Sequence, residues 1–128
     1  MNPVTQGLLK QLKDPALSAF AQDWDTVTEL VIVIYQQKSL TVEQQARFFE
    51  AQEHLQAAYP ALASQLEPYW RSARVKGELV VGDPFLAVFS KPSAKEFVEN
   101  WDVMRTLPAA REALNMLLME RIESKAEG

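Results

Sequence analysis

The sequence predicts a mainly α-helical protein, a compact bundle of about five or six helices in one domain that covers residues 1–128. Three observations support this prediction. Seven prolines and only four glycines interrupt the chain, and several of the prolines stand where a helix would begin. Two hydroxyl residues are each followed, three positions later, by Glu or Gln, which is the capping-box pattern. Hydrophobic residues make up 48% of the chain, which is enough for one core without a disulfide or metal.

The helix boundaries follow from prolines and caps. Proline fits the first helical turn because that position needs no backbone N–H, and Asp14 and Asp83 precede two prolines as predicted N-caps. The capping boxes begin at Thr41 and Ser93. The main helices are predicted over residues 15–38, 42–58, 60–74, 93–106 and 108–125, with short helices over 4–13 and 84–90 and a loop over 75–83.

An α+β fold is the alternative. Residues 26–35 are rich in β-branched side chains, which favour strands. Residues 78–81 and 85–89 flank a Gly-Asp-Pro turn, so the segments 27–35, 78–81 and 85–89 are candidates for a small sheet. Against this, no Gly or Pro lies between residues 16 and 59 to form a turn, which favours one continuous helix through 20–38.

The composition excludes several kinds of chemistry. The chain has no cysteine, which rules out disulfides, thiolate metal sites, iron–sulfur clusters and a cysteine nucleophile. A single histidine, His54, rules out a multi-histidine metal site within one chain. Glycine-rich phosphate motifs and the Gly-x-Ser-x-Gly elbow are missing. We therefore expect no cofactor, no metal and no catalytic residues.

The sequence also predicts a cytoplasmic protein. The longest apolar run, Leu30–Tyr35, is far shorter than the roughly 20 residues that cross a membrane. The first residues lack the basic and apolar blocks of a signal peptide.

Two groups of acidic residues and their neighbours are candidates for chemistry. Glu50 and His54 are four residues apart on one helix face, a spacing that can bind a metal, but the usual interpretation is an exposed polar face. Asp23 and Asp25 flank Trp24, as Asp102 follows Trp101. They are the first candidates for acid–base chemistry, with a hydrogen bond between an indole N–H and a carboxylate as the structural alternative.

Apolar helix surface indicates a protein partner. The runs Leu30–Tyr35 and Met116–Met119 are apolar on every side, so as helices they must be covered on every side. A single small domain can cover one such helix. Because the sequence contains two, we expect subunits to cover the second one, which predicts a homodimer. Core packing and a surface for a partner's helix are the alternatives for the second run. The predicted interaction residues are Met116, Leu117, Leu118, Met119 and Ile122.

A basic and aromatic segment suggests nucleic acid as an alternative partner. Aromatic rings beside basic side chains suit single-stranded nucleic acid, and residues 69–95 contain five basic against two acidic residues. The acidic isoelectric point of about 5.0 disfavours this reading. A helix C-terminus and a subunit interface are the other interpretations. The candidate nucleic-acid contacts are Tyr69, Trp70, Arg71, Arg74 and Lys76.

An internal repeat is a further hypothesis. Five residues of 15–30 recur 77 positions later in one ungapped register, over 92–107. The matches are Pro15, Phe20, Trp24, Asp25 and Leu30 with Pro92, Phe97, Trp101, Asp102 and Leu107. A duplication would imply a pseudo-symmetric bundle and no particular chemistry.

The expected function is a non-enzymatic protein–protein interaction module, a regulator, adaptor or structural subunit that works through helix–helix contacts. Two alternatives stay open: a nucleic-acid-binding regulator that uses 69–76, and a helical protein that holds an apolar small molecule between its helices.

Overall fold

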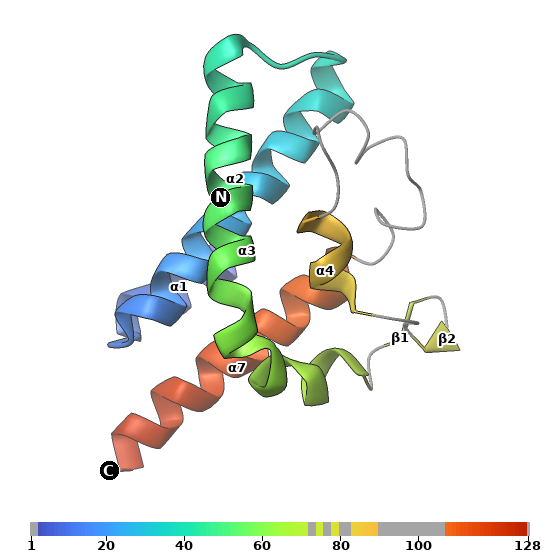
Figure 1. The fold of residues 1–128 in the computed structure, drawn as a ribbon. Helices are drawn as coiled ribbons and strands as arrows, with labels where there is room; N and C mark the ends of the chain where they lie inside the picture. The colour runs from blue at the N-terminus through green and yellow to red at the C-terminus, as the bar shows by residue number, and fades with distance from the viewer. Residues whose placement is uncertain (1–2, 72–73, 76–77, 80–82, 90–106, 128) are drawn as a thin grey trace.

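A computed structural model describes residues 3–71, 74–75, 78–79, 83–89 and 107–127 (Figure 1). It confirms the mainly α-helical prediction, with five helices packed together in the described part of the chain. The predicted helix 93–106, and with it the second copy of the repeat up to residue 106, lies outside the described residues. The helices are α1 (Pro3–Gln11), α2 (Pro15–Gln37), α3 (Val42–Arg71), α4 (Pro84–Phe89) and α7 (Leu107–Glu127).

Helix α2 is continuous through the segment that could have been a strand. Its N-cap is Asp14, whose side chain accepts a hydrogen bond from the Leu17 N–H at 3.2 Å, and Pro15 is its first residue. It ends at Gln37, and its C-cap is Lys38, which adopts a left-handed backbone conformation and donates its N–H to the Ile34 carbonyl. The predicted continuous helix is confirmed, and the strand alternative at 27–35 fails because burial of this segment within the bundle outweighs the weak strand preference of its β-branched residues.

The alternative hairpin of 78–81 with 85–89 is not formed, and the helix predicted over 84–90 is confirmed. Residues 85–89 belong to α4, whose first turn is capped by Asp83 through a 2.9 Å hydrogen bond from the Phe85 N–H. Strand β2 (Glu78–Leu79) instead pairs antiparallel with β1 (Arg74–Val75). This two-residue pairing lies mostly within the predicted loop and makes no larger sheet with the other described residues.

Helix α3 joins two helices that were predicted separately. The capping box at its start is formed as expected: the Gln44 N–H donates to Thr41 Oγ1 at 3.1 Å, and the Thr41 N–H donates to Gln44 Oε1 at 3.0 Å. The helix then continues through Pro60 and Pro68 and changes direction in its C-terminal part (Figure 1). The break predicted at Pro60 is wrong because buried residues continue on both sides of it and hold the chain helical; they are Leu55, Tyr59, Leu62, Leu66 and Trp70.

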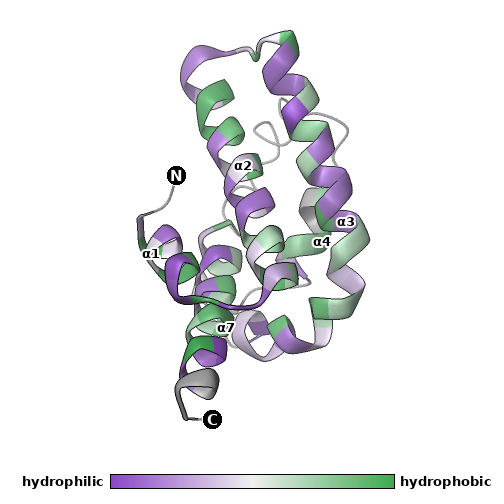
Figure 2. Cartoon of the chain, turned by 90° about the vertical axis from the view of Figure 1, so that its left-hand side faces the viewer, coloured by the Kyte–Doolittle hydropathy of each residue, from purple (hydrophilic) through white to green (hydrophobic). Residues whose placement is uncertain are grey.

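Helices α2 and α3 form an antiparallel hairpin, and the other helices pack near its open end. The core lies between α2 and α3 and extends to Phe85 of α4 and to Leu114 and Leu118 of α7. The turn between α2 and α3 is at the opposite end of the molecule from α1 and α7, so the tip of the hairpin extends beyond them (Figures 1 and 2). In the described part of the chain, no helix is long and apolar enough to cross a membrane.

Candidate functional site

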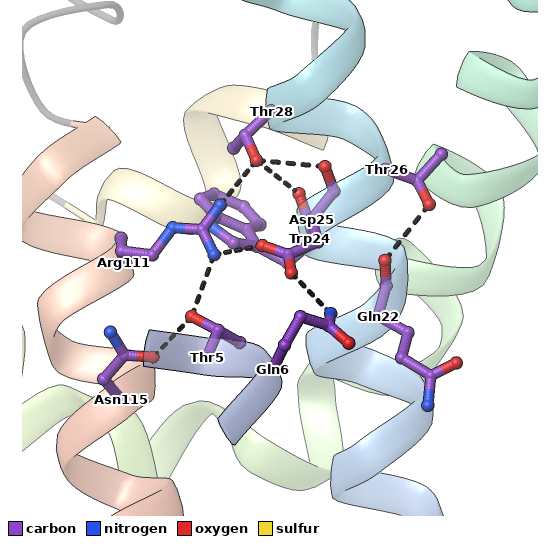
Figure 3. Close-up of polar contacts among 9 residues, drawn as sticks. All are labelled: Thr5, Gln6, Gln22, Trp24, Asp25, Thr26, Thr28, Arg111 and Asn115. Atoms are coloured by element: carbon purple, nitrogen blue, oxygen red, sulfur yellow. Dashed lines mark hydrogen bonds and ion pairs between the residues drawn. The ribbon is translucent and has the colours of Figure 1, made fainter. Parts of the chain in front are cut away.

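The most elaborate polar arrangement is an ion pair buried between helices. Asp25 of α2 binds Arg111 of α7 through Oδ1 and Nη1 (Figure 3). The Asp25 side chain is 1% exposed and that of Arg111 is 17% exposed. Two opposite charges this deep in a protein are stable only when both are paired and their remaining polar atoms have partners.

Helix α1 supplies two of those partners. Thr5 Oγ1 accepts a hydrogen bond from Arg111 Nη1 at 3.1 Å and donates to Asn115 Oδ1 at 2.8 Å. Gln6 Nε2 donates to the second carboxylate oxygen of Asp25 at 3.1 Å. One cluster of side chains therefore connects α1, α2 and α7.

Helix α2 supplies a further partner for the guanidinium. Thr28 Oγ1 accepts from Arg111 Nη2 at 2.6 Å and in turn donates to the Trp24 carbonyl at 3.0 Å (Figure 3). Both charged groups are thus held by several hydrogen bonds in fixed directions. This is the chemistry of a structural connection, because the carboxylate that would act as a base is already committed to Arg111.

The acid–base candidates have different surroundings from those expected. Asp25 pairs with Arg111, and the buried Trp24 Nε1 has no hydrogen-bond partner among the described residues, so the expected indole–carboxylate bond is not formed between Trp24 and Asp25. Asp102 lies outside the described residues.

A second polar contact holds α4 against the hairpin. Tyr59 of α3 donates its hydroxyl to Asp83 Oδ2, beside the buried ring of Phe85. Tyr59 stacks on Phe85 at a centroid distance of 5.4 Å and contacts Phe89 at 5.3 Å. Burial, followed by the hydrogen bond to Asp83, raises the pKa of Tyr59 far above its ordinary value, so the hydroxyl stays a donor.

The predicted Glu50–His54 face borders a shallow surface hollow of about 170 Å³ between α2 and α3. His54 Nδ1 lies 3.6 Å from Asp23 Oδ2. Burial raises the pKa of Asp23, while the nearby His54 lowers it and Glu50 raises it. Within the ranges that the structure describes, no three His, Asp or Glu side chains are arranged to hold a metal ion.

The predicted interaction residues on α7 separate into two sets. Leu117 and Leu118 are 2% and 0% exposed and pack in the core of this chain, whereas Met116 and Met119 are 44% and 47% exposed. Ile122 is partly buried. The two leucines are therefore unavailable to a partner in the folded chain, and the two methionines are available.

The predicted nucleic-acid contacts are described only in part, and those described differ in exposure. The ring of Trp70 belongs to the core and Tyr69 is partly buried, while Arg71 is exposed and paired with Glu67 at 2.8 Å. Arg74 lies in β1, and Lys76 lies outside the described residues.

Tyr69 and Leu117 meet at a hollow of about 290 Å³ between α3 and α7. Its volume is just below the range typical of ligand sites, and its lining mixes apolar with polar and charged groups. The lining residues are Ser64, Gln65, Pro68, Tyr69, Leu117, Glu120 and Arg121.

Comparison of the chain with protein-family models, with curated proteins and with solved structures finds no significant match.

Sequence reasoning found one half of the ion pair and missed the other. Asp25 is a sequence candidate because it forms a local carboxylate pair with Asp23 on either side of Trp24. The sequence signal for its partner is Arg111, a basic residue that follows Ala109 and Ala110 near the start of the last helix. Only the packing of α7 against α2 shows that the two residues meet.

Proposed function

We propose that this chain is a cytoplasmic, non-enzymatic protein–protein interaction module that acts through helix–helix contacts and forms a homodimer. The observation that carries the proposal is the exposure of Ile32 and Tyr35, 55% and 60%, on the most buried helix of the fold.

These two side chains continue a covered face of α2. Ala21, Asp25 and Thr28 precede them at alternating spacings of four and three residues, and all three are buried. Lower on this face, Asp25 and Thr28 contact α1 and α7. The hairpin tip extends beyond those helices (Figures 1 and 2), so in the described part of the chain Ile32 and Tyr35 keep large exposed areas.

A second copy of the chain suits this face by symmetry. In an antiparallel pairing of two α2 helices centred between Ile32 and Tyr35, each isoleucine lies opposite the other copy's tyrosine. The same register sets Glu29 opposite Lys38, and both of these side chains are exposed. A two-fold interface must complement itself, and this register pairs apolar with apolar and acid with base.

The test replaces both exposed side chains by Glu. Native mass spectrometry and sedimentation of the wild-type chain should give a dimer, and the Ile32→Glu/Tyr35→Glu variant should give a monomer with an unchanged circular dichroism spectrum. The matched control is Met116→Glu/Met119→Glu, which has the same spacing on another helix and should remain dimeric. A monomeric wild type, or a dimer that survives the α2 substitutions, would refute the proposal.

A further inference from the structure

We propose that the exposed face of α7 binds a basic amphipathic helix of another protein. The face is defined by Glu112, Met116, Met119 and Glu123, and is called the methionine stripe below. The inference deepens the proposed function, since it assigns a partner to a second face of the same module.

The four side chains form one line along the helix. Their spacings of four, three and four residues keep them on a single face, opposite Leu114 in the core. The two methionines, both nearly half exposed, occupy the middle. Methionine side chains are flexible and polarizable, which lets an apolar strip accept helices of varied shape.

The surroundings of the methionines are acidic. Over residues 107–123, every exposed charged side chain of α7 is a glutamate: Glu112, Glu120 and Glu123. The two arginines of this segment point elsewhere, because Arg111 is bound to the buried Asp25 and Arg121 Nη1 lies 3.6 Å from Asp14 Oδ2. The stripe is thus an apolar centre with negative charge at both ends.

This charge pattern disfavours a second copy on the stripe. An antiparallel pair of α7 helices centred on the methionines sets Glu112 of each opposite Glu123 of the other, and a parallel pair sets each glutamate opposite itself. Like charges in these positions oppose association. A partner helix with apolar residues between lysines or arginines instead matches the methionines at the centre of the stripe and the glutamates at its ends. Binding of an amphipathic helix by its apolar face is a common mode of peptide recognition.

The experiment uses a synthetic helical peptide as the probe. It carries leucines at i, i+3, i+4 and i+7 and lysines at both flanks, and a matched peptide carries glutamates in place of the lysines. The chain has four methionines, so methyl-labelled methionine gives a simple NMR spectrum. We expect the lysine peptide to shift the Met116 and Met119 methyl signals, with an affinity that falls as salt rises, and the glutamate peptide to leave them unchanged.

Two charge variants separate a specific site from general acidity. Glu112→Gln/Glu123→Gln should weaken binding of the lysine peptide about fivefold, the size expected for loss of two exposed ion pairs. Glu43→Gln/Glu53→Gln removes the same charge from exposed positions on α3 and should change the affinity little. Equal loss in both variants, or absence of any methyl shift, overturns the inference. Oligomeric state is measured separately, so failure of the dimer leaves this result unaffected.

Discussion

The side chain of Asp25 lies on the same face of α2 as Ala21 and Thr28, and it is buried as fully as a core residue. It is tolerated there because Arg111 neutralises its charge and Gln6 occupies its second oxygen. A buried pair of this kind contributes little net stability compared with an apolar replacement, but it specifies which helices meet. Here it connects α2 with α7, and Thr5 adds α1.

Neutralising one member of the buried ion pair should lower the free energy of unfolding. Asp25→Asn keeps the shape of the side chain but leaves the Arg111 charge uncompensated, so the free energy of unfolding should fall by about 3 kcal/mol. Glu67→Gln is the control, since it removes the same charge from an exposed pair with Arg71 and should cost less than about 1 kcal/mol. Urea unfolding of both variants measures the difference, and equal losses would contradict a structural role for the buried pair.

Asp23 should make the stability of the fold depend on pH. Its pKa is raised from 3.8 in the folded chain, mainly by burial, so the folded state binds this proton more tightly than the unfolded state. The associated stability is present below pH 3.8 and is lost as the pH rises through the folded-state pKa. Asp23→Asn does not titrate, so its stability relative to wild type should improve as the pH increases across this range.

Urea unfolding at a series of pH values checks this trend. His54 lowers the pKa of Asp23, so in a His54→Gln background the same comparison should show a larger change with pH. A stability difference between Asp23→Asn and wild type that is constant with pH would show that Asp23 titrates alike in both states.

At the scale of elements, α3 shows how packing overrides a local rule. Pro60 cannot donate a hydrogen bond to the Gln56 carbonyl and its ring crowds the preceding turn, which normally ends a helix. The helix nevertheless continues because Tyr59 and Leu62 on either side are buried against neighbouring helices. The bend visible in Figure 1 belongs to this proline-containing part of α3.

Replacement of this proline should stabilise the protein. Pro60 is exposed, so Pro60→Ala removes no buried contact and restores a backbone donor, and the free energy of unfolding should rise by about 1–3 kcal/mol. Pro15→Ala is the matched control, because the first position of α2 needs no donor and should change stability by less than about 1 kcal/mol. Thermal and urea unfolding measure both, and a stability loss in Pro60→Ala would mean that α3 needs its bend.

At the scale of the whole molecule, α7 has a core side and a solvent side. Leu118 is fully buried among the other helices and Met119, its neighbour in sequence, is nearly half exposed. Leu118→Ala should lower the free energy of unfolding by about 2–5 kcal/mol because it leaves a cavity. Met119→Ala should change it by about 0.5 kcal/mol or less. If the two substitutions lowered the free energy of unfolding by similar amounts, the assignment of Leu118 to the core side and Met119 to the solvent side would be wrong.

Much of the fold could be predicted from the sequence, but little of the candidate site. The start of α2 at Asp14 and Pro15 and the start of α3 at Thr41 are as predicted, because caps act over three or four residues. The strand alternative at 27–35 failed because it rested on propensity alone, which burial outweighs. The pairing of Asp25 with Arg111 spans 86 residues, a separation that no local pattern reports.

The sequence by itself determined the helical class, most helix starts and the kinds of chemistry that the chain lacks the residues to perform. These depend on composition and on interactions between residues a few positions apart, which the order of amino acids states directly. Only the tertiary structure decided that α3 runs through Pro60, that Leu117 and Leu118 face inward, and that Met116 and Met119 face outward. The physical reason is that burial is a property of packed helices, set by contacts between segments far apart in the chain.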